Sequence, residues 1–116
     1  MILVTGGAGF IGSAVVWELN GRGYEDIIIA DHLGTSSKWK NLRALKYSDY
    51  IEKDDLLEQI VCGDDCYSGL DAVIHMGACS STTETDCSYL AYNNYEYTKT
   101  LAGYCIKNNI RFIYAS

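Results

Sequence analysis

The sequence predicts an α/β fold in which a doubly wound parallel sheet of about five strands carries helices on both faces. Short apolar runs, rich in β-branched residues, alternate with segments of helical periodicity along the 116 residues. These runs are nearly continuous in apolar character, which is typical of strands buried on both faces. The first run leads directly into a glycine cluster that opens a helix. Together the three observations favour a parallel sheet.

The elements are expected in the order β-α-β-α-β-α-β-α-β, within one domain that contains no linker. Right-handed crossovers between parallel strands predict the strand order 3-2-1-4-5, with a crevice between strands 1 and 4 where the order reverses. The expected strands are Ile2 to Val4, Ile27 to Ala30, a weaker Tyr50 to Ile51, Ala72 to Ile74 and Phe112 to Tyr114. The helical patterns are Ile11, Val15 and Leu19; Leu56, Leu57 and Ile60; and Tyr97, Leu101, Tyr104 and Cys105.

Composition excludes several classes of function. The net charge is −6, and no run of Lys or Arg offers a footprint for nucleic acid. No apolar run approaches the length that crosses a bilayer, and no basic leader precedes the first strand, so we expect a soluble, cytoplasmic protein without membrane partners. The five cysteines form no C-x-x-C pair. We therefore expect reduced thiols and no metal site.

The glycines after the first strand predict a phosphate-binding turn. Gly7-Ala8-Gly9-Phe10-Ile11-Gly12 fits G-x-G-x-x-G, and Gly6 precedes it. Glycine permits the tight turn, the approach of the backbone to a pyrophosphate and close packing of helix on strand. The N-terminus of the helix then offers amide groups and a partial positive charge to phosphates. A merely structural glycine turn is the alternative interpretation.

Asp31 strengthens the prediction of a dinucleotide site. It ends the second expected strand about 20 residues beyond the glycines, where the acid of a Rossmann-type fold binds the adenosine ribose. An acid at this position repels a 2′-phosphate and by itself favours NAD. Lys38 and Lys53 follow the second and third strands, however, and two cations there can offset the acid and accept NADP. Lys40 is interpreted as an ordinary solvated charge.

Five stretches together carry a family resemblance: TGGAGFIG at the start, Asp31, AVIHMGACSSTTETD, YNNYEYTK and the ending FIYAS. They resemble the ADP-L-glycero-D-manno-heptose 6-epimerase family within the extended short-chain dehydrogenases/reductases. The likeness covers essentially the whole chain. Many extended members share the glycine and NN elements, whereas GACSSTTE is more particular to the heptose epimerases.

The resemblance implies a set of cofactor contacts. Phe10 and Ile11 would bind the pyrophosphate through their backbone, Asp31 and His32 would lie beside the adenosine ribose, and Lys38 and Lys53 would hold the 2′-phosphate. His32 and Met76 stand where the family pattern has Asn and Glu, which leaves only their backbone contacts expected. The full set expected to bind NADP, with NAD as the alternative, is Gly6, Gly7, Gly9, Phe10, Ile11, Gly12, Asp31, His32, Lys38, Lys53, Met76, Gly77, Ala78, Cys79, Ser80 and Asn93.

Two further features each allow two interpretations. Ser80, Ser81 and Thr82 follow the fourth strand at the edge where ligands of such sheets bind, so their hydroxyls can hold the sugar substrate. The same residues suit an N-terminal helix cap, and the two roles are compatible. His75, at the end of a buried strand, is interpreted as a packed, hydrogen-bonded core residue rather than a catalyst.

The activity implied by the resemblance is epimerisation of an ADP-heptose for the lipopolysaccharide core, by transient oxidation at C6 with NADP. Its acid/base would be the tyrosine of a Tyr-x-x-x-Lys motif. Only Tyr95 and Lys99 have that spacing, on the helix that matches the family's Asn-bearing helix, so we take no catalytic residue from this chain.

We therefore expect the N-terminal part of a longer enzyme, inactive alone, with the substrate domain outside it and with homo-oligomeric assembly. The alternatives are another nucleotide-sugar epimerase or dehydratase of the extended family, and a non-enzymatic dinucleotide-binding module.

Overall fold

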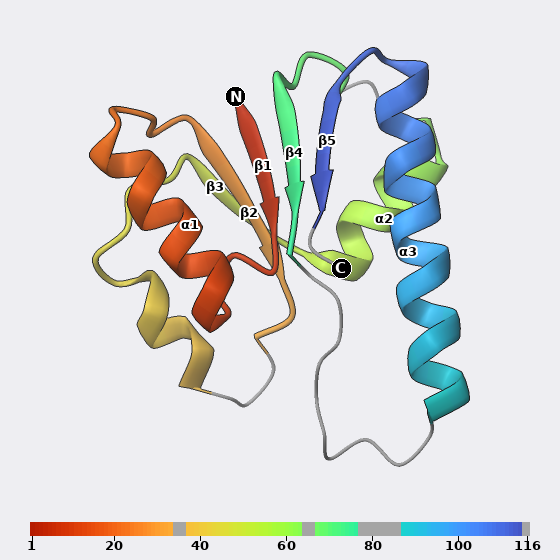
Figure 1. Ribbon diagram of the computed structural model, residues 1–116, viewed down its shortest axis with the longest axis horizontal. Helices are drawn as coiled ribbons and strands as arrows, with labels where there is room; N and C mark the ends of the chain where they lie inside the picture. Colours follow the sequence, from red (N-terminus) through yellow and green to blue (C-terminus); the bar gives the residue numbers. More distant parts are fainter. Residues whose placement is uncertain (34–36, 64–66, 77–86, 115–116) are drawn as a thin grey trace.

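The computed structural model describes residues 1–33, 37–63, 67–76 and 87–114, with the backbone alone for Lys38 and for residues 87–94. Within these residues, five strands and their connecting helices form three layers, with the sheet in the middle (Figure 1). In chain order the elements are β1 (Ile2–Thr5), α1 (Phe10–Gly21), β2 (Ile27–Asp31), η1 (Ser37–Leu42), β3 (Asp49–Glu52), α2 (Lys53–Val61), β4 (Ala72–His75), α3 (Cys87–Lys107) and β5 (Arg111–Tyr114).

The sheet is parallel and has the order β3-β2-β1-β4-β5. This confirms the predicted fold class and strand order. β1 lies in the middle, with Thr5 paired to Ala30 of β2 on one side and to His75 of β4 on the other. The order therefore reverses between β1 and β4, and ligands of doubly wound sheets bind outside the carboxyl ends of the strands at such a point.

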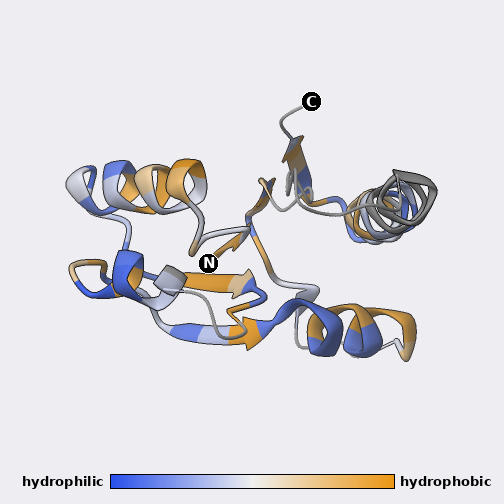
Figure 2. Ribbon diagram, turned by 90° about the horizontal axis from the view of Figure 1, so that it is seen from below, coloured by the Kyte–Doolittle hydropathy of each residue, from blue (hydrophilic) through white to orange (hydrophobic). Residues whose placement is uncertain are grey.

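Each face of the sheet has its own apolar core, because successive side chains of a strand point to opposite faces. Leu3 and Ile28 face the side of α2 and α3, where they pack with Leu56 and Leu101. On the opposite face, the cluster beneath α1 and η1 contains Val4, Ala8, Val16, Ile27, Ile29 and Leu42. Figure 2 shows this layering, with helices on both sides of the sheet and mostly hydrophobic colours along its central strands. Burial on both faces explains why the central strands β1 and β2 are nearly continuous in apolar residues.

Two details differ from the sequence prediction. The connection between β2 and β3 contains the six-residue 3-10 helix η1 where the expected order has an α-helix. In α1, the side chain expected to face the sheet at Ile11 is 62% exposed, whereas Val16 is fully buried. Gly12 packs closely against the glycine turn, and this contact sets the rotation of α1 about its axis. Gly12 and Val16 therefore form the buried side of the helix, and Ile11 faces outward.

Within the described residues, no helix combines the length and apolar character needed to cross a membrane.

Candidate functional site

The glycine turn between β1 and α1 forms one wall of the candidate site. The amide of Gly6 donates to Ala30 O at 2.7 Å, which joins the start of the turn to β2. Gly6 has a φ of +70°, a conformation that glycine adopts without a steric penalty. The amide of Gly9 donates to Gly6 O at 3.0 Å, and the amide of Ser13 donates to Gly9 O at 2.9 Å as the helix begins. The amides of the helical residues before Ser13, beginning with Phe10, therefore have no acceptor within the helix. They point out of the helix N-terminus.

Gly12 and Gly7 are required by close packing. A Cβ at Gly12 would lie 1.9 Å from the carbonyl oxygen of Gly6 and 3.0 Å from Cα of Gly7. A Cβ at Gly7 would lie 2.7 Å from Cγ2 of the buried Ile29. The first helical turn thus lies directly on the glycine turn, which itself lies on β2. The spacing of the glycines reflects this packing of helix on turn on strand.

Asp31 at the end of β2 is joined to the glycine turn. Its side chain is buried, and Oδ2 accepts the amide of Ala8 at 2.9 Å. Oδ1 accepts the amide of His32 at 2.7 Å. The predicted acid and the predicted glycine turn therefore form a single cradle, in which a buried carboxylate lies beside the N-terminus of α1.

Asn41 in η1 also holds the turn, and the sequence analysis did not single it out. Its Nδ2 donates to Ala8 O at 2.8 Å. Ala8 consequently has its amide bound by Asp31 and its carbonyl bound by Asn41. An Asn in a segment without a recognised motif gives no such signal, because Asn41 lies 33 residues from Ala8 in the chain.

The carboxyl ends of β2 and β3 carry a second polar group. Nδ1 of His32 lies 3.4 Å from Oε2 of Glu52. The hydroxyl of Tyr50 donates to Asp31 O at 2.9 Å, and it lies 3.2 Å from Oε1 of Glu52. Burial, with the nearby Glu52 carboxylate, raises the pKa of Tyr50 above its usual range, so this hydroxyl stays protonated as a donor. The predicted Lys53 follows immediately as the first residue of α2.

At the end of β4, His75 is a hydrogen-bonded core residue. It is 3% exposed, its Nδ1 is 2.5 Å from Oγ1 of Thr5, and its Nε2 is 2.8 Å from Oγ1 of Thr98. Its ring is stacked with those of Tyr97 and Phe112 at centroid distances of 5.7 and 5.9 Å. Burial lowers the pKa of His75, which favours the neutral ring. These contacts confirm its interpretation as a packed core histidine. Met76 directly follows β4, and its amide donates to Thr5 O at 3.1 Å.

Several predicted site residues lie outside the described part of the structure. They are Gly77, Ala78, Cys79, Ser80, Ser81 and Thr82, and also the side chains of Lys38 and Asn93. The cradle that the structure does describe brings together the glycine turn, the start of α1 and Asp31, with His32 next to Asp31.

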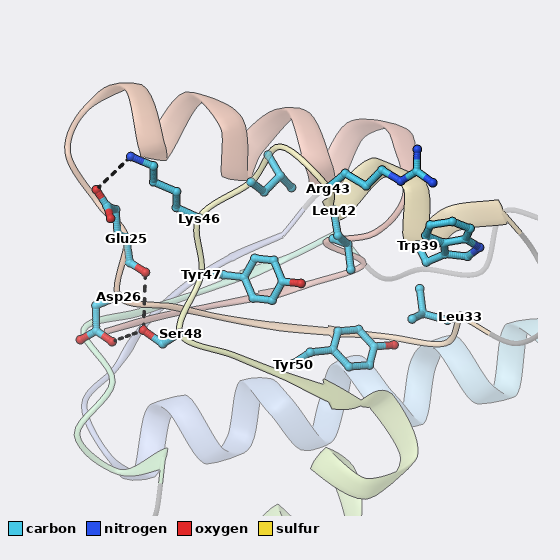
Figure 3. Close-up of a pocket in the computed structure, with 11 residues that line it drawn as sticks. Glu25, Asp26, Leu33, Trp39, Leu42, Arg43, Lys46, Tyr47, Ser48 and Tyr50 are labelled. Carbon is cyan, nitrogen blue, oxygen red and sulfur yellow. Dashed lines mark hydrogen bonds and ion pairs between the residues drawn. The ribbon is translucent and has the colours of Figure 1, made fainter.

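A hollow of about 1020 Å³ is lined by residues of η1 and of the segment that follows it, and by Tyr50 of β3 (Figure 3). The segment that follows η1 forms one wall, and the rings of Tyr47 and Tyr50 point toward Leu33 and Trp39. The guanidinium of Arg43 lies 4.6 Å from the centre of the Trp39 ring. Among the described residues that line this hollow, none belongs to the predicted cofactor-binding set.

The Tyr95 and Lys99 pair lies on the exposed side of α3. The ammonium group of Lys99 is 5.8 Å from the centre of the Tyr95 ring, a cation-π arrangement between successive helical turns. Tyr95 is 63% exposed. The pair therefore lies at the surface and is not part of the cradle.

The described thiols differ in exposure: Cys62 is exposed and Cys105 is buried, and both are free. Burial raises the pKa of Cys105 to about 11, so its thiol is uncharged at neutral pH. Within the described ranges, no group of His, Cys, Asp and Glu side chains is arranged to hold a metal ion.

Comparisons with known proteins agree with this geometry. The model of the NAD dependent epimerase/dehydratase family matches residues 2–116. ADP-L-glycero-D-manno-heptose-6-epimerase of Fusobacterium nucleatum is 54% identical over 116 residues, which are 100% of this chain and 35% of that protein. This chain therefore spans about a third of the length of that relative.

Two solved structures show the same arrangement of the backbone. The ADP-L-glycero-D-manno-heptose-6-epimerase of Helicobacter pylori has a TM-score of 0.80 and 25% identity, covering 99% of this chain and 38% of that one. The UDP-glucuronic acid 4-epimerase of Bacillus cereus, in complex with NAD, has a TM-score of 0.70 and 25% identity, covering 96% of this chain and 38% of that one.

Proposed function

Since the chain belongs to the NAD dependent epimerase/dehydratase family, we propose that residues 1–116 are the cofactor-binding part of an NADP-dependent heptose epimerase. The reaction proposed for the whole protein converts ADP-D-glycero-D-manno-heptose to ADP-L-glycero-D-manno-heptose by transient oxidation at C6. The substrate domain and the Tyr-x-x-x-Lys acid/base pair belong to the rest of the enzyme in this proposal. The heptose epimerase name of the Fusobacterium relative, at 54% identity, supports the substrate class.

One observation carries the cofactor-binding role: the hydrogen bond from the amide of Ala8 to the Asp31 carboxylate at 2.9 Å. It places the acid that would bind the adenosine ribose against the turn that would bind the pyrophosphate. The two parts of a dinucleotide site come from different strands and share this contact. The buried carboxylate at this place supports a dinucleotide site over a merely structural glycine turn.

The residues present suit a dinucleotide diphosphate. Gly9 precedes α1 as the N-cap residue without a side chain, and a Cβ at Gly12 would strike Gly6 O, so the backbone is bare where phosphate would approach. The amides of Phe10 and Ile11 at the helix N-terminus would donate to the pyrophosphate. Asp31 and His32 would meet the ribose. In this proposal Lys38 and Lys53 would neutralise a 2′-phosphate, offsetting the carboxylates of Asp31 and Glu52.

A nicotinamide cofactor bound here would supply the transient oxidation and reduction at C6 of the sugar. The residues of this chain would serve that chemistry by binding and orientation. Met76, directly after β4, would border the cofactor, and Gly77, Ala78, Cys79, Ser80 and Asn93 would extend that border. Ser80, Ser81 and Thr82 would present hydroxyl groups to the sugar or its diphosphate.

The proposal is tested with the full-length protein and ADP-D-glycero-D-manno-heptose in D₂O, followed by NMR. We expect the C6 epimer to form and to keep its original hydrogen at C6, because the hydride returns from the cofactor. Solvent deuterium at C6, or turnover of UDP-galactose in place of the heptose, would contradict the mechanism or the substrate. The 116-residue chain alone is expected to bind NADP without turnover, since it lacks a positioned acid/base.

A further inference from the structure

Both backbone groups of Ala8, in the middle of the glycine turn, are bound by side chains from other segments. Asp31 accepts the amide at 2.9 Å, and Asn41 donates to the carbonyl at 2.8 Å. Only the acid belongs to the recognised dinucleotide pattern. We propose that Asn41 is a positioning residue for the pyrophosphate of the dinucleotide. This inference rests on the proposed function.

The peptide between Ala8 and Gly9 is held at both of its polar ends. Its carbonyl oxygen accepts from Asn41 Nδ2, and its N–H donates to Gly6 O at 3.0 Å. A peptide unit fixed at both ends cannot rotate about its flanking bonds without breaking one of these contacts. The turn immediately before α1 therefore keeps one orientation. The amides of Phe10 and Ile11, which follow it directly, keep theirs.

Charge explains why an amide side chain suits this position. Each carbonyl oxygen of the turn carries a partial negative charge, and an uncompensated one near a bound diphosphate would repel it. Asn41 removes one such charge by donation and brings no net charge of its own. A carboxylate of the same shape would place a negative charge against Ala8 O and beside the phosphates.

The packing of η1 determines where Asn41 lies. The next residue, Leu42, is buried in the same cluster as Ala8, Val16 and Ile29. Leu42 thus anchors the 3-10 helix against α1, and Asn41 is brought over the glycine turn. The Asn41 residue as a whole remains exposed at the surface. Water can therefore solvate Ala8 O when the side chain is removed, so the fold should tolerate its loss.

Asn20 provides a matched control with the same chemistry at the other end of α1. Its Nδ2 donates to Tyr24 O at 2.9 Å and to Lys46 O at 2.8 Å, and its Oδ1 accepts the amide of Lys46 at 2.8 Å. Like Asn41, it ties the segment between β2 and β3 to a neighbouring element. Unlike Asn41, it lies at the amino edge of the sheet, away from the glycine turn.

The test measures dissociation constants for ADP-ribose, NAD and NADP by calorimetry on the full-length protein. The variants are Asn41→Ala, Asn41→Asp and Asn20→Ala, each at a temperature where circular dichroism shows it to be folded. We expect Asn41→Ala to weaken all three ligands by roughly 3- to 10-fold, because binding must then order a turn that the hydrogen bond to Ala8 O held in place. Asn41→Asp should weaken them at least as much, although its shape is unchanged. Asn20→Ala should leave the three constants within about 2-fold, because it touches no phosphate-binding group.

The NADP-to-NAD affinity ratio separates positioning of the pyrophosphate from contact with the ribose. It should stay unchanged in the Asn41 variants, since both cofactors share the diphosphate. Unweakened binding of ADP-ribose by Asn41→Ala, an equal loss in Asn20→Ala, or a shifted ratio would each overturn the positioning role while leaving the proposed function intact. Failure of the unmodified protein to bind ADP-ribose, NAD or NADP would overturn both.

Discussion

Thr5 and His75 lie opposite each other on β1 and β4, with Thr5 Oγ1 2.5 Å from His75 Nδ1. The other ring nitrogen, Nε2, is 2.8 Å from Thr98 Oγ1 on α3. One imidazole therefore joins two strands and a helix at the point where the strand order reverses. Each hydroxyl can donate or accept, so the two threonines satisfy the neutral ring in either tautomer. A buried polar group that is satisfied in this way fixes the relative positions of its neighbours.

We predict that His75 makes the fold sensitive to mild acid. Burial lowers the pKa of His75 below the usual 6.5, so the unfolded chain binds this proton more readily than the folded one. The free energy of unfolding should therefore be unaffected by this group well above pH 6.5. It should fall as the pH drops below 6.5, by at most about 1.4 kcal/mol per pH unit, until the folded pKa is passed.

Urea unfolding between pH 5 and 7.5 checks this prediction. His75→Gln should flatten the dependence, whereas His32→Gln, at the chain's other and exposed histidine, should retain it. Equal slopes in the unmodified protein and in His75→Gln would show that another group is responsible.

Gly12→Ala should destabilise the protein by roughly 1–3 kcal/mol or more, because the new Cβ would meet Gly6 O at 1.9 Å and backbone must move. Gly21→Ala is the matched control in the same helix. A Cβ there meets nothing within 4 Å, so the change should be neutral or stabilising by up to about 1 kcal/mol. Urea unfolding of both variants measures the difference. Equal stability would mean that helix and turn can separate freely.

Replacing Lys38 and Lys53 together with Ala should lower the affinity ratio of NADP to NAD by roughly 10-fold, since two charge-assisted contacts to a 2′-phosphate are lost. Calorimetry on the full-length double variant gives the ratio. Lys40→Ala serves as the control, because its ammonium group lies near the Trp39 ring at 5.9 Å. An unchanged ratio in the double variant would remove both lysines from the phosphate site.

The 116-residue chain is expected to self-associate through β5. This strand is at one end of the described sheet, and Ile113 on it is 49% exposed. An apolar edge strand offers unpaired backbone groups to another chain. Light scattering at micromolar concentration should show oligomers that Ile113→Lys reduces. Ile106→Lys, at an isoleucine of α3 that is 82% exposed, should have little effect. A monodisperse monomer unaffected by Ile113→Lys would exclude association through this edge.

The sequence by itself determined the elements that depend on local patterns. Short apolar runs predicted all five strands to within one residue of their ends. The signal is clearest in β1 and β2, whose burial on both faces leaves no polar alternation, whereas β3 and β5 lie at the edges of the sheet and are mostly half-buried or exposed. The glycine spacing predicted the turn before α1, and the position of Asp31 predicted an acid at the end of β2. Chain connectivity and the right-handed crossover then predicted the strand order, which the structure confirms.

Only the tertiary structure decided which distant groups meet. The hydrogen bond between Asn41 and Ala8 joins residues 33 positions apart, and that between His75 and Thr98 joins residues 23 positions apart. No local sequence pattern therefore indicates either bond. The buried stripe of α1 passes through Val16 rather than Ile11 because the contact of Gly12 with the glycine turn sets the rotation of the helix. Propensity and periodicity describe one segment at a time. Partners across the sheet are selected when whole elements pack together, because only packing brings their polar atoms within hydrogen-bonding distance.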